Sequence, residues 1–510
     1  MKFNIIFLLI LMYVSANDVI IVGGGLSGLT TGYRLLKEGL NVTIYEGDKE
    51  LGGRTRSIWY NETGISVGGT WSMFENTETM DLSQEFGIVP DIELSTQKTL
   101  NIQRIIKSPV LLLKLWLIGY SISEDYQTNM PDLDYISVKS WLDEQEKEYG
   151  INAIKAVRDY LILLETMPRD LNISMLFATR LIYDRLKLVD EYNQIYTHGA
   201  YRWEGGTGVL VNALVDKIKE MGGKIFTNSQ ITKIVWDKNQ IKVIINKTKE
   251  DQSKRVVIST SLLASKNIKY EPNISEQYFH LFNNIQIFDD PVYQLILIYS
   301  EPWWRNNCGI LLPDPETESE EKGVWGSFFE LTPKNMNVGV LRILIRTIHI
   351  NGLNFEEIVE SGIQYLEQHY DNPEIKPKIR NRLLKAKYYN WNDYNNTIPG
   401  VTYYYKPDGT LINYGKYLRQ TIANKIYWGG AERAKKGLHW IEGAISRGNE
   451  IAIEILKEEN RTTSLLVKDV GFLKKEYIYW LMKSLDIILS GWYKILFKID
   501  RLIFWMTGST

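Results

Sequence analysis

The sequence predicts an α/β fold: a Rossmann-like nucleotide-binding domain interleaved with a mixed α+β substrate domain, followed by a C-terminal amphipathic helical tail. Three patterns support this prediction: a glycine-rich strand–turn–helix unit near the N-terminus, a second strand–glycine–helix unit near residue 430, and a helical charge pattern after residue 477. The length of 510 residues suggests about three domains at roughly 150 residues each. Interleaving would reduce these to two domains and a tail.

Composition excludes several classes of function. The 59 basic and 61 acidic residues nearly balance, whereas a nucleic-acid-binding protein normally carries a basic excess. The single cysteine, Cys308, rules out an intrachain disulfide, a cysteine-ligated zinc and an iron–sulfur cluster. The five histidines show no metal-ligand spacing, so we expect no metal site. Any redox chemistry should therefore belong to an organic cofactor.

The N-terminus resembles a secretory signal peptide. Lys2 precedes an apolar run from Ile5 to Val14, and Ser15-Ala16 supplies small residues at a cleavage point. The run is too short to span a bilayer comfortably. We expect residues 1–16 to be a cleaved leader that directs the chain to the secretory pathway; an uncleaved anchor and a buried segment remain alternatives.

The C-terminal tail, residues 464–510, carries polar and charged residues on one helical arc. Their spacings of 7, 4, 4 and 3 keep them on one face, and the rest of the surface is mostly apolar and rich in tryptophan. The residues of this arc are Lys483, Ser490, Lys494, Lys498 and Arg501. This pattern favours a helix lying on a membrane surface, with packing on the globular part as the alternative. A spanning helix fits less well because charges recur throughout.

A dinucleotide fingerprint opens the globular part. Residues 19–22 predict a buried parallel strand, residues 23–28 have the GxGxxG pattern, and an amphipathic helix should follow and end near Gly39. Gly23 permits the tight turn, Gly25 lets a pyrophosphate approach the backbone, and Gly28 allows close helix–strand packing. The helix N-terminus at Leu26 and Ser27 offers N–H groups to phosphates.

The acidic residue that this fingerprint requires follows a second predicted strand, residues 42–45. Glu46 lies at the distance expected for a carboxylate that binds a ribose hydroxyl. Residues 51–55, Leu-Gly-Gly-Arg-Thr, come next and resemble the GG-R segment of the glutathione-reductase-like FAD superfamily. That resemblance implies FAD rather than NAD, with Gly53 and Arg54 near the cofactor phosphates.

Further motifs narrow the resemblance to the flavin-containing amine oxidase (monoamine oxidase) family, over about residues 18–457. Residues 67–71 (VGGTW) are similar to the family's D-x-GG-[ST]-[YW] stretch, although the acidic position is not evident. The other matching segments, in order, are residues 204–210 (EGGTGVL), 256–260 (VVIST), 301–305 (EPWWR), 409–415 (GTLINYG), 418–420 (LRQ), 426–432 (IYWGGAE) and 440–445 (WIEGAI). The family forms of the last two are IYFAGTE and GYMEGA.

The resemblance implies further cofactor contacts and a domain division. The implied contacts are Gly69, Thr70, Ile231, Gly430, Glu432 and Ile441. The FAD-binding domain should comprise residues 17–75, 200–265 and 388–457. The substrate domain should comprise 76–199 and 266–387, with a mixed sheet from 286–350 that packs against helices from 76–200. The helix that starts near Glu442 should direct its N-terminus at the cofactor.

This chain departs from the family at four positions. The flavin-linking cysteine of monoamine oxidases falls on Val401, so we expect non-covalent FAD. One of the two aromatic walls of the substrate site falls on Thr402, while Trp440 keeps the other, and Tyr403 or Tyr404 are possible substitutes. A lysine that holds a water at the flavin falls on Gln294.

The fourth departure concerns the arginine that pairs the substrate carboxylate in amino-acid oxidases, which falls on Ser72. Amines are therefore favoured over amino acids as substrates. The candidate catalytic residues are Gln294, Trp391, Thr402 and Trp440. His439 directly precedes Trp440 and is a candidate base. Amine oxidation in this family needs no histidine base, so we expect a structural role for His439.

Together these features predict an FAD-dependent amine oxidase. A hydride passes from the amine to the flavin, O₂ reoxidises the flavin, and the products are an imine or aldehyde, ammonia or an amine, and hydrogen peroxide. Two alternatives remain open at this point: an FAD-dependent oxidase or desaturase of a lipophilic substrate, and a non-catalytic membrane-associated flavoprotein. The fold alone does not decide among them, and the sequence does not indicate an oligomeric state.

Overall fold

The computed structural model describes residues 17–61, 63–73, 77–91, 109–163, 167–168, 170–185, 200–287, 293–304, 325–333, 336–345, 352–370, 372–391 and 403–461. Four features singled out in the sequence lie outside these residues: the leader, Cys308, the 401–402 position and the tail at 464–510. Within the described ranges, no helix combines the length and apolar character that crossing a membrane requires.

The largest sheet of the described chain has eight strands drawn from three distant stretches of sequence. Its order is β12-β9-β10-β11-β1-β2-β8, and β19 pairs with β11. The strands are β1 (Asn17–Val22), β2 (Val42–Tyr45), β8 (Lys224–Phe226), β9 (Ile231–Trp236), β10 (Ile241–Ile245), β11 (Lys249–Ile258), β12 (Lys269–Glu271) and β19 (Ile426–Trp428). β1 is parallel to β2 and β11, and β11 is parallel to β19. The predicted strands at 19–22 and 42–45 are confirmed, and β19 is the strand of the unit predicted near residue 430.

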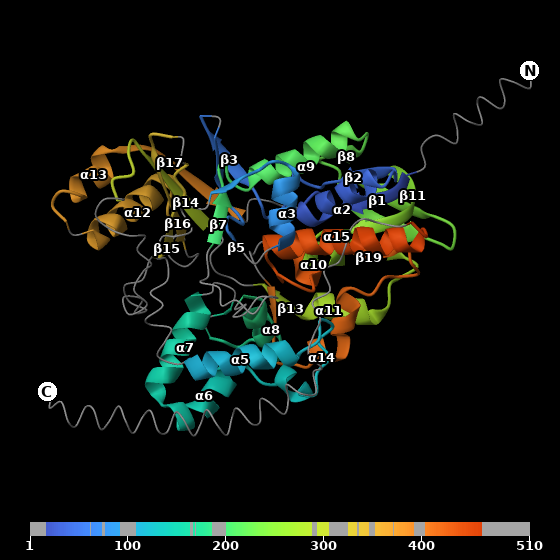
Figure 1. Ribbon diagram of the computed structural model, residues 1–510, viewed down its shortest axis with the longest axis horizontal. Helices are drawn as coiled ribbons and strands as arrows, with labels where there is room; N and C mark the ends of the chain where they lie inside the picture. The colour runs from blue at the N-terminus through green and yellow to red at the C-terminus, as the bar shows by residue number, and fades with distance from the viewer. Residues whose placement is uncertain are drawn as a thin grey trace, which may run out of the picture.

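Helices cover one side of this sheet (Figure 1). They are α2 (Leu26–Lys37), α3 (Thr77–Glu85), α9 (Gly208–Glu220) and α15 (Ile441–Glu458). The apolar face of α15 is buried, with Ile445, Ile451 and Ile455 at 0 % exposure, because it packs in one cluster with the apolar residues of α2. Gly448 brings the two helices close: Thr31 Oγ1 donates to Gly448 O at 3.2 Å.

A second sheet is antiparallel throughout, which corrects the predicted mixed sheet. Its order is β15-β16-β14-β17, and the strands are β15 (Trp325–Glu330), β16 (Gly339–Ile345), β14 (Tyr293–Tyr299) and β17 (Leu383–Asn390). One face packs on α12 (Phe355–His369) and α13 (Lys376–Asn381). The other face packs against β3 (Ser57–Tyr60), β4 (Thr63–Ser66) and the residues that follow β4.

The helices between residues 109 and 185 do not cover this second sheet, contrary to prediction. They are α5 (Pro109–Ser121), α6 (Val138–Tyr149), α7 (Ile151–Leu163) and α8 (Met175–Arg185), and they form a separate layer (Figure 1). Their apolar residues belong to one cluster with the other side of the large sheet and with α11 (Glu276–Asn284) and α14 (Thr410–Tyr414). Alternating apolar residues in a strand indicate that a face is buried but do not identify its partner.

Short elements connect these layers. They are β5 (Ser72–Met73), β6 (Pro90–Asp91), β7 (Ala200–Trp203), β13 (Ile285–Ile287), β18 (Tyr403–Tyr405), α10 (Leu262–Lys266) and the 3₁₀ turns η2 (Pro131–Asp134), η6 (Gly415–Leu418) and η7 (Ala431–Arg433). β13 pairs with β18, so Tyr403 lies in a two-stranded ribbon next to the helical layer. Arg180 on α8 donates to Lys435 O, and Leu438 N donates to Asp184 Oδ2 at 3.2 Å. These bonds fix the loop before α15.

Candidate cofactor-binding and active site

The glycine turn after β1 has the geometry of a phosphate cradle. Gly23 has φ +107°, a left-handed conformation that favours glycine. A Cβ atom at Gly28 would lie 2.1 Å from Gly23 O, so only glycine lets α2 pack this closely on the strand. A Cβ atom at Gly25 would instead meet only Gly53 Cα at 3.9 Å. Gly25 therefore presents open backbone, as a bound pyrophosphate requires.

The N-terminus of α2 is suited to bind an anion. Leu26 begins the helix and is buried, and no side chain caps its N-terminus at Gly25. The first N–H groups of a helix have no partner within the helix, and they carry the positive end of the helix dipole. The uncapped turn and the open glycine backbone together fit the pyrophosphate of a dinucleotide.

Glu46 connects the glycine turn with the segment before Ile231, a predicted cofactor contact. Its Oε2 accepts from Gly24 N at 2.7 Å, and its Oε1 accepts from Asp48 N at 2.8 Å. Ser229 N donates to Glu46 O at 2.7 Å, which brings the start of β9, at Ile231, towards the same end. Burial raises the pKa of Glu46. Each carboxylate oxygen has a further lone pair that can accept from a ribose hydroxyl.

Arg54 and Glu432 form an ion pair that the sequence analysis did not predict. Arg54 NH2 lies 2.5 Å from Glu432 Oε1, and the Arg54 guanidinium lies 5.8 Å from the ring centroid of Tyr403. Burial alone would raise the pKa of Glu432, but the positive charge of Arg54 holds it below its usual value. The site therefore contains a fixed positive group beside the phosphate cradle. An acidic residue in a buried strand–helix turn was the available signal, because a buried carboxylate needs a cation.

The segment that should line the flavin is held from several sides. A Cβ atom at Gly69 would lie 3.3 Å from Ile441 Cγ1, so the start of α15 lies against Gly69. Trp391 Nε1 donates to Val67 O at 3.0 Å, and Thr70 Oγ1 donates to Gly68 O at 2.8 Å. The structure thus brings together four predicted residues from distant parts of the chain.

Gln294 and an arginine that sequence reasoning missed lie on one face of the second sheet. Ile296 pairs with Arg342 in register, and Gln294 is two residues along β14 on the same face. Arg342 NH1 donates to Thr70 Oγ1 at 2.7 Å. Gln294 is buried, and its Oε1 has no hydrogen-bond partner among the described residues. No sequence pattern indicated a role for Arg342, because its position depends on strand register.

Of the two predicted wall positions, the structure describes Trp440 but not Thr402. Trp440 is the N-cap residue of α15 and is half-buried, next to Ile441. Thr402 lies outside the described residues, but the next residue, Tyr403, is buried between Arg54 and His439. Trp391 contacts Tyr389, whose strand position is opposite Gln294, with ring centroids 5.1 Å apart.

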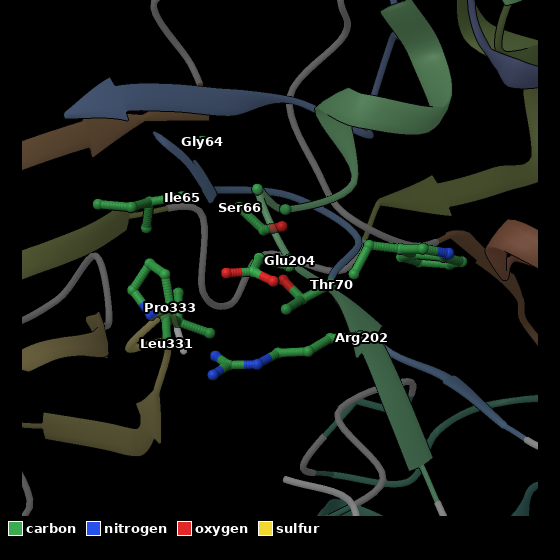
Figure 2. Close-up of a pocket in the computed structure, with 11 residues that line it drawn as sticks. Gly64, Ile65, Ser66, Thr70, Arg202, Glu204, Leu331 and Pro333 are labelled. Carbon is green, nitrogen blue, oxygen red and sulfur yellow. The ribbon is translucent and has the colours of Figure 1, made fainter. Parts of the chain in front are cut away.

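Figure 2 shows a small pocket whose lining contains no residue of the glycine turn after β1. Its lining includes Ser66, Thr70, Arg202 and Glu204, and of these only Thr70 is a predicted site residue. Arg202 donates to Glu330 O at 2.8 Å and to Thr332 O at 2.6 Å. The pocket therefore belongs to the support of the Thr70 segment and is not the predicted cofactor cradle.

The family profile described as flavin containing amine oxidoreductase matches residues 26–456. The chain belongs to this family. The chain is similar to a probable flavin-containing monoamine oxidase A of Dictyostelium discoideum, with 23% identity over 86% of this chain and 97% of that protein. It is also similar to human flavin-containing amine oxidase B, with 22% identity over 86% of each chain.

Two solved structures share the fold of this amine oxidoreductase. Cyclohexylamine oxidase from Brevibacterium oxydans aligns with a TM-score of 0.70 at 19% identity, covering 88% of this chain and 100% of that one. Wild-type putrescine oxidase bound to putrescine aligns with a TM-score of 0.67 at 18% identity, covering 86% and 99%. The predicted family, its flavin cofactor and the oxidation of an amine are confirmed. The non-covalent link to FAD stays a prediction, because position 401 lies outside the described residues.

Proposed function

We propose that this amine oxidoreductase removes a hydride from the carbon next to the nitrogen of an amine and passes it to N5 of bound FAD. The observation that carries the proposal is the contact of Gly69 with Ile441, because it joins the two predicted flavin-lining segments at one point. FAD supplies the two-electron chemistry. Water then hydrolyses the imine to an aldehyde or ketone and ammonia or an amine, and O₂ takes the two electrons to give hydrogen peroxide.

In this proposal the chain positions the substrate and provides the electrostatic environment. Trp440 orients the amine as an aromatic wall, and its position at the N-terminus of α15 supports this role. Trp391 holds the Val67–Thr70 segment through its bond to Val67 O. Gln294 holds a water through its buried amide, without the charge of a lysine. Thr402 aligns with the position of the second wall, lies outside the described residues, and supplies no aromatic ring.

We further propose an amine rather than an amino acid as substrate. Ser72, at the position of a carboxylate-binding arginine, is buried in β5 opposite Tyr201. Two buried arginines near this segment are already engaged: Arg202 donates to two carbonyl oxygens, and Arg342 donates to Thr70 Oγ1. A substrate carboxylate would therefore have to displace bonds that hold the fold.

A peroxide assay on purified protein tests the proposal, using primary, secondary, di- and polyamines with the matching amino acids as controls. We expect peroxide with at least one amine and none with its α-carboxylated analogue. Peroxide from a lipophilic non-amine alone would favour the oxidase or desaturase alternative. A flavin that no compound reduces would favour the non-catalytic one.

The location of the protein and its domain division are also proposals. The leader pattern at 1–16 supports entry into the secretory pathway, and the charged arc at 483–501 supports binding to a membrane surface. The sheet assembled from three stretches supports a FAD-binding domain interleaved with the substrate domain. Flotation with anionic vesicles tests the tail: Lys494→Glu with Lys498→Glu should abolish it, whereas Lys217→Glu with Lys219→Glu should not.

A further inference from the structure

His439 has a left-handed backbone conformation, which is uncommon for residues other than glycine. Its φ is +70°, in the left-handed region that glycine enters without steric cost. A side chain that persists in such a conformation points to a function that offsets the strain.

The turn around His439 does not need an imidazole. His439 N donates to Ala431 O at 3.1 Å, and Trp440 N donates to Gly437 O at 2.9 Å. Both bonds use only backbone atoms, so a glycine could make the same turn. The imidazole is half-buried and packs edge-on against Phe177, with ring centroids 5.8 Å apart.

One ring nitrogen of His439 is enclosed and unused. Nδ1 has no hydrogen-bond partner in the part of the chain that the structure describes. A buried polar atom without a partner lowers stability, as does the left-handed backbone. Two independent costs thus meet at one residue, which makes a purely structural role a poor explanation.

His439 lies among the predicted cofactor contacts. The charges of Arg54 and Glu432 both influence the pKa of His439. The centroid of the Tyr403 ring lies 6.4 Å from that of the imidazole. Two residues later, Ile441 begins α15 and touches Gly69. Burial lowers the pKa of His439 to about 4, so the ring is neutral at neutral pH. A neutral imidazole offers one donor and one acceptor nitrogen.

We propose that the His439 imidazole contacts the bound FAD and that Nδ1 makes a hydrogen bond to it beside the N-terminus of α15. The inference rests on FAD binding, as in the proposed function. It makes His439 a cofactor-contacting residue and replaces the structural role expected from the sequence. No electron or proton transfer is assigned to the ring.

The decisive variant is His439→Gly in the full FAD-loaded protein, since it relieves the backbone strain and removes the imidazole together. We expect the melting temperature of the apoprotein to rise. We expect FAD affinity to fall by about fivefold and the visible spectrum of the bound flavin to shift, because one hydrogen bond is lost. His439→Asn, which tolerates the left-handed backbone and keeps a polar group, should recover part of the affinity.

Ala423→Gly is the matched control. Ala423 also has a left-handed backbone, with φ +51°, but it is exposed and outside the site. This variant should raise the melting temperature and leave FAD affinity and spectrum unchanged. Wild-type affinity and spectrum in His439→Gly would overturn the inference while leaving the proposed function intact. A wild-type chain that binds no FAD would overturn both.

Discussion

The Ser27 hydroxyl accepts a hydrogen bond from the backbone N–H of Gly430 at 3.0 Å. Ser27 belongs to the N-terminal fingerprint and Gly430 to the C-terminal glycine motif, so this bond joins the two halves of the cofactor site directly. A Cβ atom at the neighbouring Gly429 would lie 3.1 Å from the same hydroxyl, so the two turns are closely packed. The bond is buried, and its loss leaves a backbone donor without a partner.

Ser27→Ala should therefore weaken both stability and cofactor binding. We expect the free energy of unfolding to fall by about 1–3 kcal/mol, the cost of one unsatisfied buried donor. FAD affinity, measured by quenching of flavin fluorescence, should fall as well. Ser137→Ala is the control: it removes the N-cap of α6 far from the site, and should cost about 1 kcal/mol without affecting FAD. Equal FAD affinity in both variants would contradict the account.

Two glycines of the fingerprint should respond differently to alanine. Gly25→Ala adds a methyl group that meets only Gly53 Cα, so the apoprotein should keep wild-type stability while FAD binding is blocked. Gly28→Ala places a methyl group 2.1 Å from Gly23 O and should destabilise the apoprotein by about 3 kcal/mol. Chemical denaturation of both apoproteins and FAD titration check this. An apoprotein equally stable in both variants would mean that the turn is packed differently.

The ion pair of Arg54 with Glu432 makes the free energy of unfolding depend on pH. The folded pKa of Glu432 lies below its ordinary value of 4.5, so the pair stabilises above that pH and its contribution is lost as pH falls through the folded value. Glu432→Gln should cost about 3 kcal/mol at pH 7, because it leaves Arg54 without its partner.

Denaturation at a series of pH values tests this sign. The difference in free energy of unfolding between wild type and Glu432→Gln should become smaller as the pH falls below about 4.5. Glu220→Gln removes an exposed carboxylate paired with Lys217 and should shift stability by less than about 1 kcal/mol at any pH. A gap that widens in acid would show that the carboxylate is not held ionised by Arg54.

Trp391 should support the rate of flavin reduction through its indole N–H more than through its aromatic ring. Trp391→Phe keeps an aromatic side chain but leaves Val67 O without its donor, so the segment up to Thr70 should shift. We expect about a tenfold lower rate of flavin reduction by a substrate amine. Trp303→Phe is the matched control, since Trp303 is buried but its Nε1 has no partner among the described residues. Rapid-mixing spectroscopy should show a wild-type rate for the control.

Short-range patterns were sufficient to locate the cofactor half of the site. The strand, turn and helix at residues 17–37 follow from spacing alone, because Gly23 and Gly28 meet steric demands set within a few residues. The C-terminal strand and helix, at 426–428 and 441–458, were identified in the same way. Local sequence encodes such turns directly.

Contacts set by strand register or by distant segments could not be predicted. Arg342 reaches Thr70 only because β16 pairs with β14 at one register. The pairing of Arg54 with Glu432 needs both glycine motifs to meet. The antiparallel order of the second sheet depends on β17, which follows two helices and pairs back with β14. His439 showed no unusual signal because backbone strain is invisible in a single sequence.

Anaerobic titration of the purified FAD-loaded protein with a panel of amines tests the central claim most directly. The account predicts that at least one amine bleaches the visible absorption of the flavin, that O₂ restores it, and that one hydrogen peroxide forms per amine consumed. It also predicts that acid releases the flavin from the precipitated protein, since no cysteine holds it. A flavin that stays oxidised with every amine would contradict the account.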